Sequence, residues 1–190
     1  MILIATAGRA GSSFLMKFLY NCGMDTGTDT WYDLPNAGME HKDIVSINND
    51  LIGNIIKNKD SNMWFIWGRI ADLKLDVYKD PQLVIHPDII KNWWHVRHDI
   101  KVIFLYRNAV EVVDSLMKIP EWTGPNYRCF PEMVEQKNDD FLKMCVKLKI
   151  PVKKFKFPGL LGEANEVIES LSDWIEFPDN ALNIWKRLRR

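Results

Sequence analysis

Cysteine is scarce in this chain of 190 residues, and the few that occur lack the spacing of a metal or redox site. The three are Cys22, Cys129 and Cys145, and no two of them form a Cys-x-x-Cys pair. An odd, widely spaced set argues against a disulfide framework and a zinc site, and it is typical of a reducing compartment. We therefore expect a cytoplasmic protein.

An excess of positive charge is also missing, because Lys and Arg total 25 and Asp and Glu total 25. A basic site would have to be a local cluster, so we expect no nucleic-acid partner. No apolar run is long enough to cross a bilayer, and the chain begins with a strand-like run. We expect no signal peptide and no membrane partner. Hydrophobic residues make up 47% of the chain, which is enough for one packed domain spanning residues 1–190.

The chain is organised around its first stretch. The apolar run Ile2–Thr6 leads into the loop Ala7–Ser13, and the residues that follow are apolar at helical spacing: Phe14, Leu15, Phe18, Leu19 and Cys22. This pattern predicts a strand, a glycine-rich turn and a helix in succession. Glycine lets the backbone approach a ligand closely, and the free N–H groups of a helix's first turn attract a phosphate or similar anion.

This loop lacks the Lys-Ser or Lys-Thr pair that closes a Walker A sequence, so it has no lysine for the terminal phosphates of a nucleoside triphosphate. Arg9 supplies a fixed positive charge, and Ser12 and Ser13 supply hydroxyl donors. The alternative interpretation is an ordinary turn between a strand and a helix.

Strands and helices alternate along the rest of the chain. Apolar or alternating segments predict strands at Met63–Trp67, Leu73–Val77, Lys101–Tyr106 and Val152–Phe157, and the first two compete for a place in the sheet. Helical spacing and start signals predict helices near residues 43–57, 87–94, 108–120, 131–148, 167–175 and 182–188. Residues 24–42 are interpreted as a polar connection.

This alternation predicts a three-layer α/β/α domain with a mostly parallel central sheet. Such sheets bind ligands at the carboxyl ends of their strands. Three of the predicted strand ends carry notable polar groups: the Gly8–Ser13 loop, the pair Lys79-Asp80, and Arg107.

A second constellation follows the strand KVIFLY. Arg107 ends that strand, and Ser115 lies eight positions later, about two turns into the next helix. Asn108 and Glu111 have the spacing of a capping box, and the expected buried stripe of the helix is Val110, Val113, Leu116 and Met117. Arg107 and Ser115 could face one phosphate beside the first loop, or they could be an ordinary surface pair.

These motifs together resemble the sulfotransferases that use 3′-phosphoadenosine 5′-phosphosulfate (PAPS). Their first motif is a strand followed by G-R-S-G-T/S-S/T, and this chain has Gly8-Arg9-Ala10-Gly11-Ser12-Ser13. Their second motif is an apolar strand, an arginine and a serine eight positions later, as in KVIFLYRNAVEVVDS. GMEHKDIVSINNDLI is similar to the G-x-x-E…N-x-x-L segment of bacterial members, and VYKDPQLVIHP to their K-D-P-R-L segment.

The resemblance covers roughly residues 1–118, and the remainder matches in element order. Three positions depart from the pattern. Ala10 replaces the usual serine, Ala109 the usual proline, and Gln82 the arginine of K-D-P-R. The two alanines preserve the backbone course, whereas Gln82 could alter a contact with substrate or cofactor.

The resemblance implies a P-loop NTPase-like sulfotransferase fold. It also implies transfer of a sulfuryl group from PAPS to a hydroxyl or amine on a small-molecule, glycan or peptide acceptor, with no metal required. The loop Gly8–Ser13 would hold the 5′-phosphosulfate, and Arg107 and Ser115 would hold the 3′-phosphate. Lys79 would reach the bridging oxygen or sulfuryl group, and the product would be adenosine 3′,5′-bisphosphate.

The proton acceptor is left open among four residues. Glu40 is the first choice because it occupies the acidic position of the G-x-x-E segment. His41 has an ordinary pKa better suited to a base near neutrality, and Asp29 and His86 are further candidates. Three residues of the loop after Pro120 could stack on the adenine or the acceptor: Trp122, Tyr127 and Arg128.

Two other classes of protein remain open. A P-loop kinase or nucleotide hydrolase would share the fold, although the Lys-Ser/Thr pair is missing. A nucleotide-binding protein without catalysis is the other, because the sequence does not identify the acceptor side. The sequence also leaves the oligomeric state open.

Overall fold

A parallel sheet of four strands forms the centre of the computed structural model, which describes residues 1–27, 31–33, 38–57, 63–118 and 130–189. The strand order is β4-β1-β5-β6, with the bounds β1 Ile2–Ala5, β4 Val77–Lys79, β5 Lys101–Tyr106 and β6 Val152–Lys156. Ile2 of β1 is in register with Val77 on one side and with Lys101 on the other. All four strands therefore place their carboxyl ends at one edge of the sheet.

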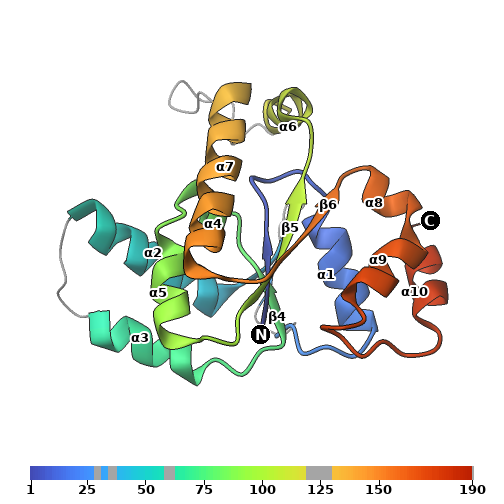
Figure 1. The fold of residues 1–190 in the computed structure, drawn as a ribbon, viewed down its shortest axis with the longest axis horizontal. Coiled ribbons are helices and arrows are strands. Elements are labelled where there is room, and N and C mark those ends of the chain that lie inside the picture. Colours follow the sequence, from blue (N-terminus) through green and yellow to red (C-terminus); the bar gives the residue numbers. More distant parts are fainter. Residues whose placement is uncertain (28–30, 34–37, 58–62, 119–129, 190) are drawn as a thin grey trace.

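Helices cover both faces of this sheet, as Figure 1 shows. One face carries α2 Lys42–Lys57, α3 Met63–Asp72, α4 Gln82–Ile85, α5 Ile89–Val96 and α7 Pro131–Leu148. The other carries α1 Ser12–Asn21, α8 Gly159–Gly162, α9 Ala164–Leu171 and α10 Ala181–Leu188. The remaining helix, α6 Ala109–Leu116, lies beyond the carboxyl end of β5, at the top of Figure 1. This arrangement confirms the predicted three-layer α/β/α class.

Two hydrophobic cores result from the alternation of side chains along the strands. Leu3 and Val102 point into the core beneath α2, α5 and α7. Ile4 and Ile103, one residue further along each strand, point into the core beneath α1, α9 and α10. Because both faces are covered, a continuous apolar run such as β5 is buried over most of its length.

A second, two-stranded antiparallel sheet lies beside the carboxyl end of β4. Its strands are β2 Trp31–Asp33 and β3 Gly38–His41, and β3 contacts α1, α2 and β4. The expectation that residues 24–42 form only a polar connection is therefore wrong. The segment GMEH contains one apolar residue, so no alternation marks it as a strand, yet all four of its residues are buried by their neighbours.

Three predicted element positions also need correction. Met63–Trp67 is the first half of helix α3, whose buried residues Ile66 and Ile70 are four apart, and a short apolar run does not distinguish a strand from a helix. The predicted strand Leu73–Val77 joins the sheet only at its last residue, because β4 begins at Val77. The helix expected to begin at Pro87 begins at Ile89, after a separate short helix, α4, that was not predicted.

The start of α6 follows the prediction only in part. The Asn108 side chain caps the helix by accepting hydrogen bonds from the backbone N–H groups of Val110 and Glu111. The Glu111 carboxylate accepts from Arg107 Nε, so it does not return to the cap as a capping box requires. Val110 and Met117 are exposed, and the buried stripe is Ala109, Val112 and Leu116, one position out of phase with the prediction.

None of the helices in these described ranges is long and apolar enough to span a membrane.

Candidate functional site

The loop between β1 and α1 has the backbone conformation of an anion-binding turn. Gly8, Arg9 and Gly11 have φ values of 103°, 55° and 80°, all in the left-handed region. Successive residues of this kind turn their N–H groups into one concavity. Gly11 is also the N-cap of α1, and glycine has no side chain to satisfy the first amides of the helix. The Gly8 N–H already donates to Thr6 Oγ1 at 3.1 Å, so the start of α1 is where uncapped backbone donors are expected.

Phe157, just after β6, packs against this loop from the far side. A Cβ added at Gly11 would lie 2.6 Å from Phe157 Cδ2, so only glycine fits between the loop and the ring. The Arg107 guanidinium lies over the same ring, 5.3 Å from its centroid. Phe157 thus fixes the relative position of the loop and of the arginine that ends β5.

Lys79 is the buried cation of the site. It ends β4 and its residue is only 2% exposed. An ammonium group has three N–H donors. Here they bond to Ser13 Oγ at 2.9 Å, to the Gly38 carbonyl oxygen, and to Glu40 Oε1 at 2.8 Å. The lysine therefore joins β4 to the first turn of α1 and to β3.

Glu40 is a buried acid whose two oxygens differ in environment. Its Oε1 pairs with Lys79, whereas Oε2 is buried and has no hydrogen-bond partner among the residues that the structure describes. Met39, between Gly38 and Glu40, has a left-handed φ of 70°, and the residues on either side of it both contact Lys79. Strained backbone of this kind is concentrated at functional sites.

Burial determines the electrostatics around Lys79. It lowers the pKa of the Lys79 ammonium, because desolvation penalises the charged form, and Arg9 lowers it further. Glu40 and Asp80 act in the opposite direction. We expect the lysine to remain charged, since its partner Glu40 is hydrogen-bonded to it. Lys79 forms its ion pair with Glu40 and not with its neighbour in sequence, Asp80.

The second motif lies directly beside the first loop. Arg9 Nε donates to Ser115 Oγ at 2.9 Å, and Arg107 Nη1 donates to the Arg9 carbonyl oxygen at 3.3 Å. Arg107 Nε also pairs with Glu111 Oε2 at 2.8 Å. The structure thus brings together the predicted residues Arg9, Arg107 and Ser115. It links Arg9 to the second motif, whereas the resemblance assigns Arg9 to the 5′-phosphosulfate.

Behind Lys79, Asp80 belongs to a buried polar chain. Asp80 Oδ2 accepts from Asn48 Nδ2 at 2.8 Å, and Oδ1 accepts from the Gln82 backbone N–H at 2.8 Å. Asn48 Oδ1 accepts from Trp93 Nε1 at 2.8 Å. Burial raises the pKa of Asp80 to about 6, although both hydrogen bonds to the carboxylate oppose that rise.

The other candidate bases occupy different surroundings. His41 Nδ1 accepts the Asp43 backbone N–H at 3.2 Å, and the ring packs against Gly27, where an added Cβ would lie 2.6 Å from Nε2. Burial lowers its pKa. His86 follows α4, and both burial and Lys137 of α7 lower its pKa. The structure does not bring these histidines together with the loop.

Several predicted residues lie outside the described part of the chain. They are Asp29, Trp122, Tyr127 and Arg128.

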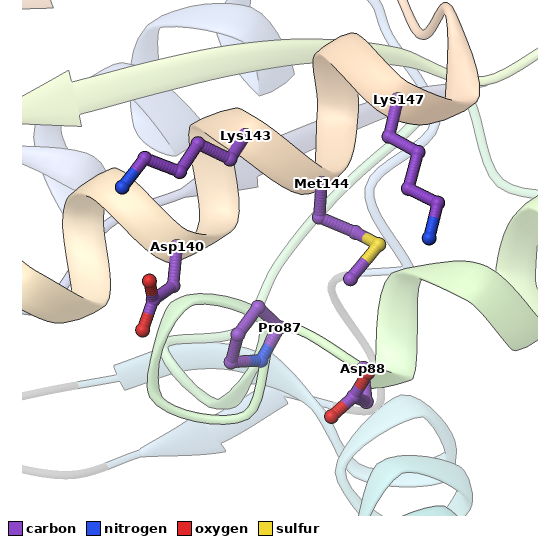
Figure 2. Close-up of a pocket in the computed structure, with 6 residues that line it drawn as sticks. All are labelled: Pro87, Asp88, Asp140, Lys143, Met144 and Lys147. Carbon is purple, nitrogen blue, oxygen red and sulfur yellow. The ribbon is translucent and has the colours of Figure 1, made fainter.

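One open cleft lies elsewhere, between α7 and the turn before α5. Figure 2 shows its lining: Pro87, Asp88, Asp140, Lys143, Met144 and Lys147. None of the residues predicted for the site belongs to this lining. Across the residues that the structure describes, no three His, Cys, Asp or Glu side chains are grouped to hold a metal ion.

The fold has a counterpart among solved structures. The sulfotransferase domain from the curacin biosynthetic pathway superimposes with a TM-score of 0.60 at 17% sequence identity. The match covers 97% of this chain and 77% of that chain. This chain has a sulfotransferase-like fold. No protein-family model and no curated protein sequence matches it. At this level of identity the likeness concerns the fold alone.

Sequence reasoning missed three contributors to the site: the Gly38 carbonyl, Asn48 and Phe157. Asn48 had a signal, because it stands four positions after Ile44 and three before Leu51 on the buried face of α2. A polar residue at a buried helix position needs partners and so indicates a network. Gly38 and Phe157 had no signal in the sequence. The contact of the Gly38 carbonyl with Lys79 and that of the Phe157 ring with Gly11 both depend on tertiary packing.

Asp80 gives a prediction for stability as a function of pH. Its pKa rises from 3.8 to about 6 on folding, so its contribution to stability is present in acid and is lost as the pH rises through about 6. The free energy of unfolding of the wild type, relative to Asp80→Asn, should fall by about 2 kcal/mol between about pH 4.5 and about pH 7.5. Chemical denaturation at several pH values measures this difference.

Asp72→Asn, at an exposed position of α3, controls for the loss of one negative charge. A difference between wild type and Asp80→Asn that does not change with pH would contradict the raised pKa.

Proposed function

We propose that this protein transfers a sulfuryl group from PAPS to a hydroxyl or amine acceptor. The observation that carries the proposal is the convergence on Lys79. The anion loop, the strand end with its lysine and the acid of β3 are far apart in sequence, yet Ser13, Lys79 and Glu40 form one hydrogen-bonded group. The Arg9–Ser115–Arg107 cluster adjoins that loop.

The hydrogen-bond donors and cations of the site suit the anionic groups of PAPS. The nucleotide carries phosphate and sulfate oxygens at one end and a separate 3′-phosphate. Backbone N–H groups in left-handed turns and at the start of a helix bind such oxyanions, and arginine binds phosphate with two parallel hydrogen bonds. The chain supplies the loop amides, Ser12, Ser13 and Lys79 for the first group. It supplies Arg107 and Ser115 for the second, with Arg9 between the two.

The roles of the side chains follow from charge and position. The donor, when bound, provides a sulfuryl group activated by its phosphate leaving group. Lys79 would stabilise negative charge on the leaving oxygen, because a buried ammonium acts in a medium with little water to screen it. Ser13, bonded to Lys79, would orient the ammonium and the loop relative to each other.

Glu40 would accept the proton of the attacking hydroxyl or amine. A general base needs a free oxygen within reach of the acceptor, and Glu40 Oε2 is buried without a partner among the described residues. Its other oxygen is held by Lys79, which fixes the carboxylate in place. The His41 ring nitrogen Nδ1 is already engaged with the backbone of α2, so the geometry favours Glu40.

The first prediction for this function concerns recognition of the 3′-phosphate. Arg107→Ala should weaken binding of adenosine 3′,5′-bisphosphate by about 1.5–3 kcal/mol, or roughly tenfold to more than a hundredfold. It should barely change binding of adenosine 5′-phosphate, which lacks the group that Arg107 would hold. Isothermal calorimetry with both nucleotides measures the preference.

Arg69→Ala is the matched control, because Arg69 of α3 is another partly buried arginine that pairs with an exposed carboxylate, that of Asp50. Its preference for the bisphosphate should equal that of the wild type. If the wild type binds adenosine 3′,5′-bisphosphate and adenosine 5′-phosphate equally, the proposal that PAPS is the sulfuryl donor is wrong.

The second prediction concerns the base. Glu40→Gln keeps the shape of the side chain and removes its ability to take up a proton, so turnover should fall by about 10²–10⁴-fold. Binding of adenosine 3′,5′-bisphosphate should persist within a few-fold. Transfer of labelled sulfate from PAPS, with an acceptor found by library screening, measures turnover.

His41→Ala is measured in parallel as the alternative base. Full activity in Glu40→Gln together with loss of activity in a folded His41→Ala would assign the proton transfer to His41 instead.

A further inference from the structure

The buried hydrogen bonds from Trp93 to Asn48 and from Asn48 to Asp80 can run in one direction only. An indole N–H donates only, so Trp93 Nε1 requires the amide oxygen of Asn48 at 2.8 Å. The amide nitrogen of Asn48 must then face Asp80, and it donates to Oδ2 at 2.8 Å. The Gln82 backbone N–H, also donor only, occupies Oδ1. Both oxygens of Asp80 therefore face donors, an arrangement that favours the carboxylate over the carboxylic acid.

Asp80 and Lys79 are neighbours in sequence but belong to opposite sides of the sheet. Lys79 bonds to Ser13 of α1 and to β3, whereas Asp80 bonds to Asn48 of α2. Asp80 makes no hydrogen bond to the ammonium among the contacts of the described residues, so it acts on Lys79 through its charge. That charge helps to keep Lys79 protonated.

We propose that Asn48 is a positioning residue for sulfuryl transfer: it holds Asp80 as a carboxylate behind Lys79 and thereby keeps a negative charge next to the Lys79 ammonium. This inference rests on the proposed function. Asn48 is fully buried and lies on the α2 layer, so it acts only through Asp80.

The charged groups around Asp80 show why the asparagine matters. Burial and Glu40 raise the pKa of Asp80, and the hydrogen bonds from Asn48 and Gln82, together with Lys79, lower it. The buried Tyr78 hydroxyl is the other titratable group that interacts with Asp80. The resulting pKa of about 6 lies only slightly below neutrality. Loss of one donor to the carboxylate should raise this pKa further, so that a smaller fraction of Asp80 is charged near neutrality.

The experiment compares Asn48→Leu, which keeps a similar volume and removes both hydrogen bonds, with the wild type. We expect the acid limb of the pH profile of kcat/KM to move upward by about one pH unit or more. We also expect the ¹³Cγ carboxyl signal of Asp80 in the ligand-free protein to titrate at higher pH than in the wild type. Asn54→Leu is the matched control, because Asn54 is on the same helix and bonds to Met63 Sδ, away from Asp80.

The carboxyl signal separates this inference from the proposed function, since it needs neither donor nor acceptor. A protein without sulfuryl transfer or bisphosphate binding would refute the function. An unchanged Asp80 titration in Asn48→Leu would refute the positioning role. If Asn48→Leu does not fold, Trp93→Phe replaces it, because it removes only the donor that orients the Asn48 amide. A smaller shift in the same direction then supports the role, and no shift refutes it.

Discussion

The candidate site depends on one buried lysine and on the acceptors that surround it. An ammonium group removed from water costs several kcal/mol unless each of its donors finds a partner. Lys79 meets this requirement with Ser13 from α1 and with the Gly38 carbonyl and Glu40 from β3. The burial of one charge therefore requires the loop, the strand end and the small second sheet to stay in register.

The second cation cluster is tied to the same loop by its backbone. Arg107 donates to the carbonyl oxygen of Arg9, and Arg9 reaches Ser115 on α6. Phe157 supports both the loop and Arg107 from β6. Lys79 ends β4 and Arg107 follows β5, so both clusters lie at the edge where the strands of the parallel sheet end.

Much of the fold could be predicted from the sequence because its signals are local. The four central residues of the run KVIFLY are apolar and buried, and α7 begins at Pro131 and ends at Leu148 as expected. The loop with Gly8 and Gly11 indicated an anion site from residue types alone. The resemblance to sulfotransferases agrees with the fold of the curacin-pathway domain.

The parts that could not be predicted depend on tertiary contacts. β3 has no alternation, and its four residues are buried by the lysine and helices around them. Met63–Trp67 is apolar enough for either element, and the packing of Ile66 and Ile70 decides for a helix. On α6 the cap residue Asn108 was predicted correctly, but Val110 and Met117 of the predicted buried stripe are exposed, and Ala109 and Val112 are buried instead.

The central claim is that this edge of the sheet binds a nucleotide bearing a 3′-phosphate and donates a sulfuryl group from it. Thermal unfolding with equal concentrations of adenosine 3′,5′-bisphosphate or of ATP with magnesium tests this claim most directly. A ligand that binds only the folded state at about a hundred times its Kd adds about 2.7 kcal/mol of stability. The account predicts a clear rise of Tm with the bisphosphate and a smaller one with ATP and magnesium. The reverse order would contradict it and would favour a nucleotide kinase or hydrolase.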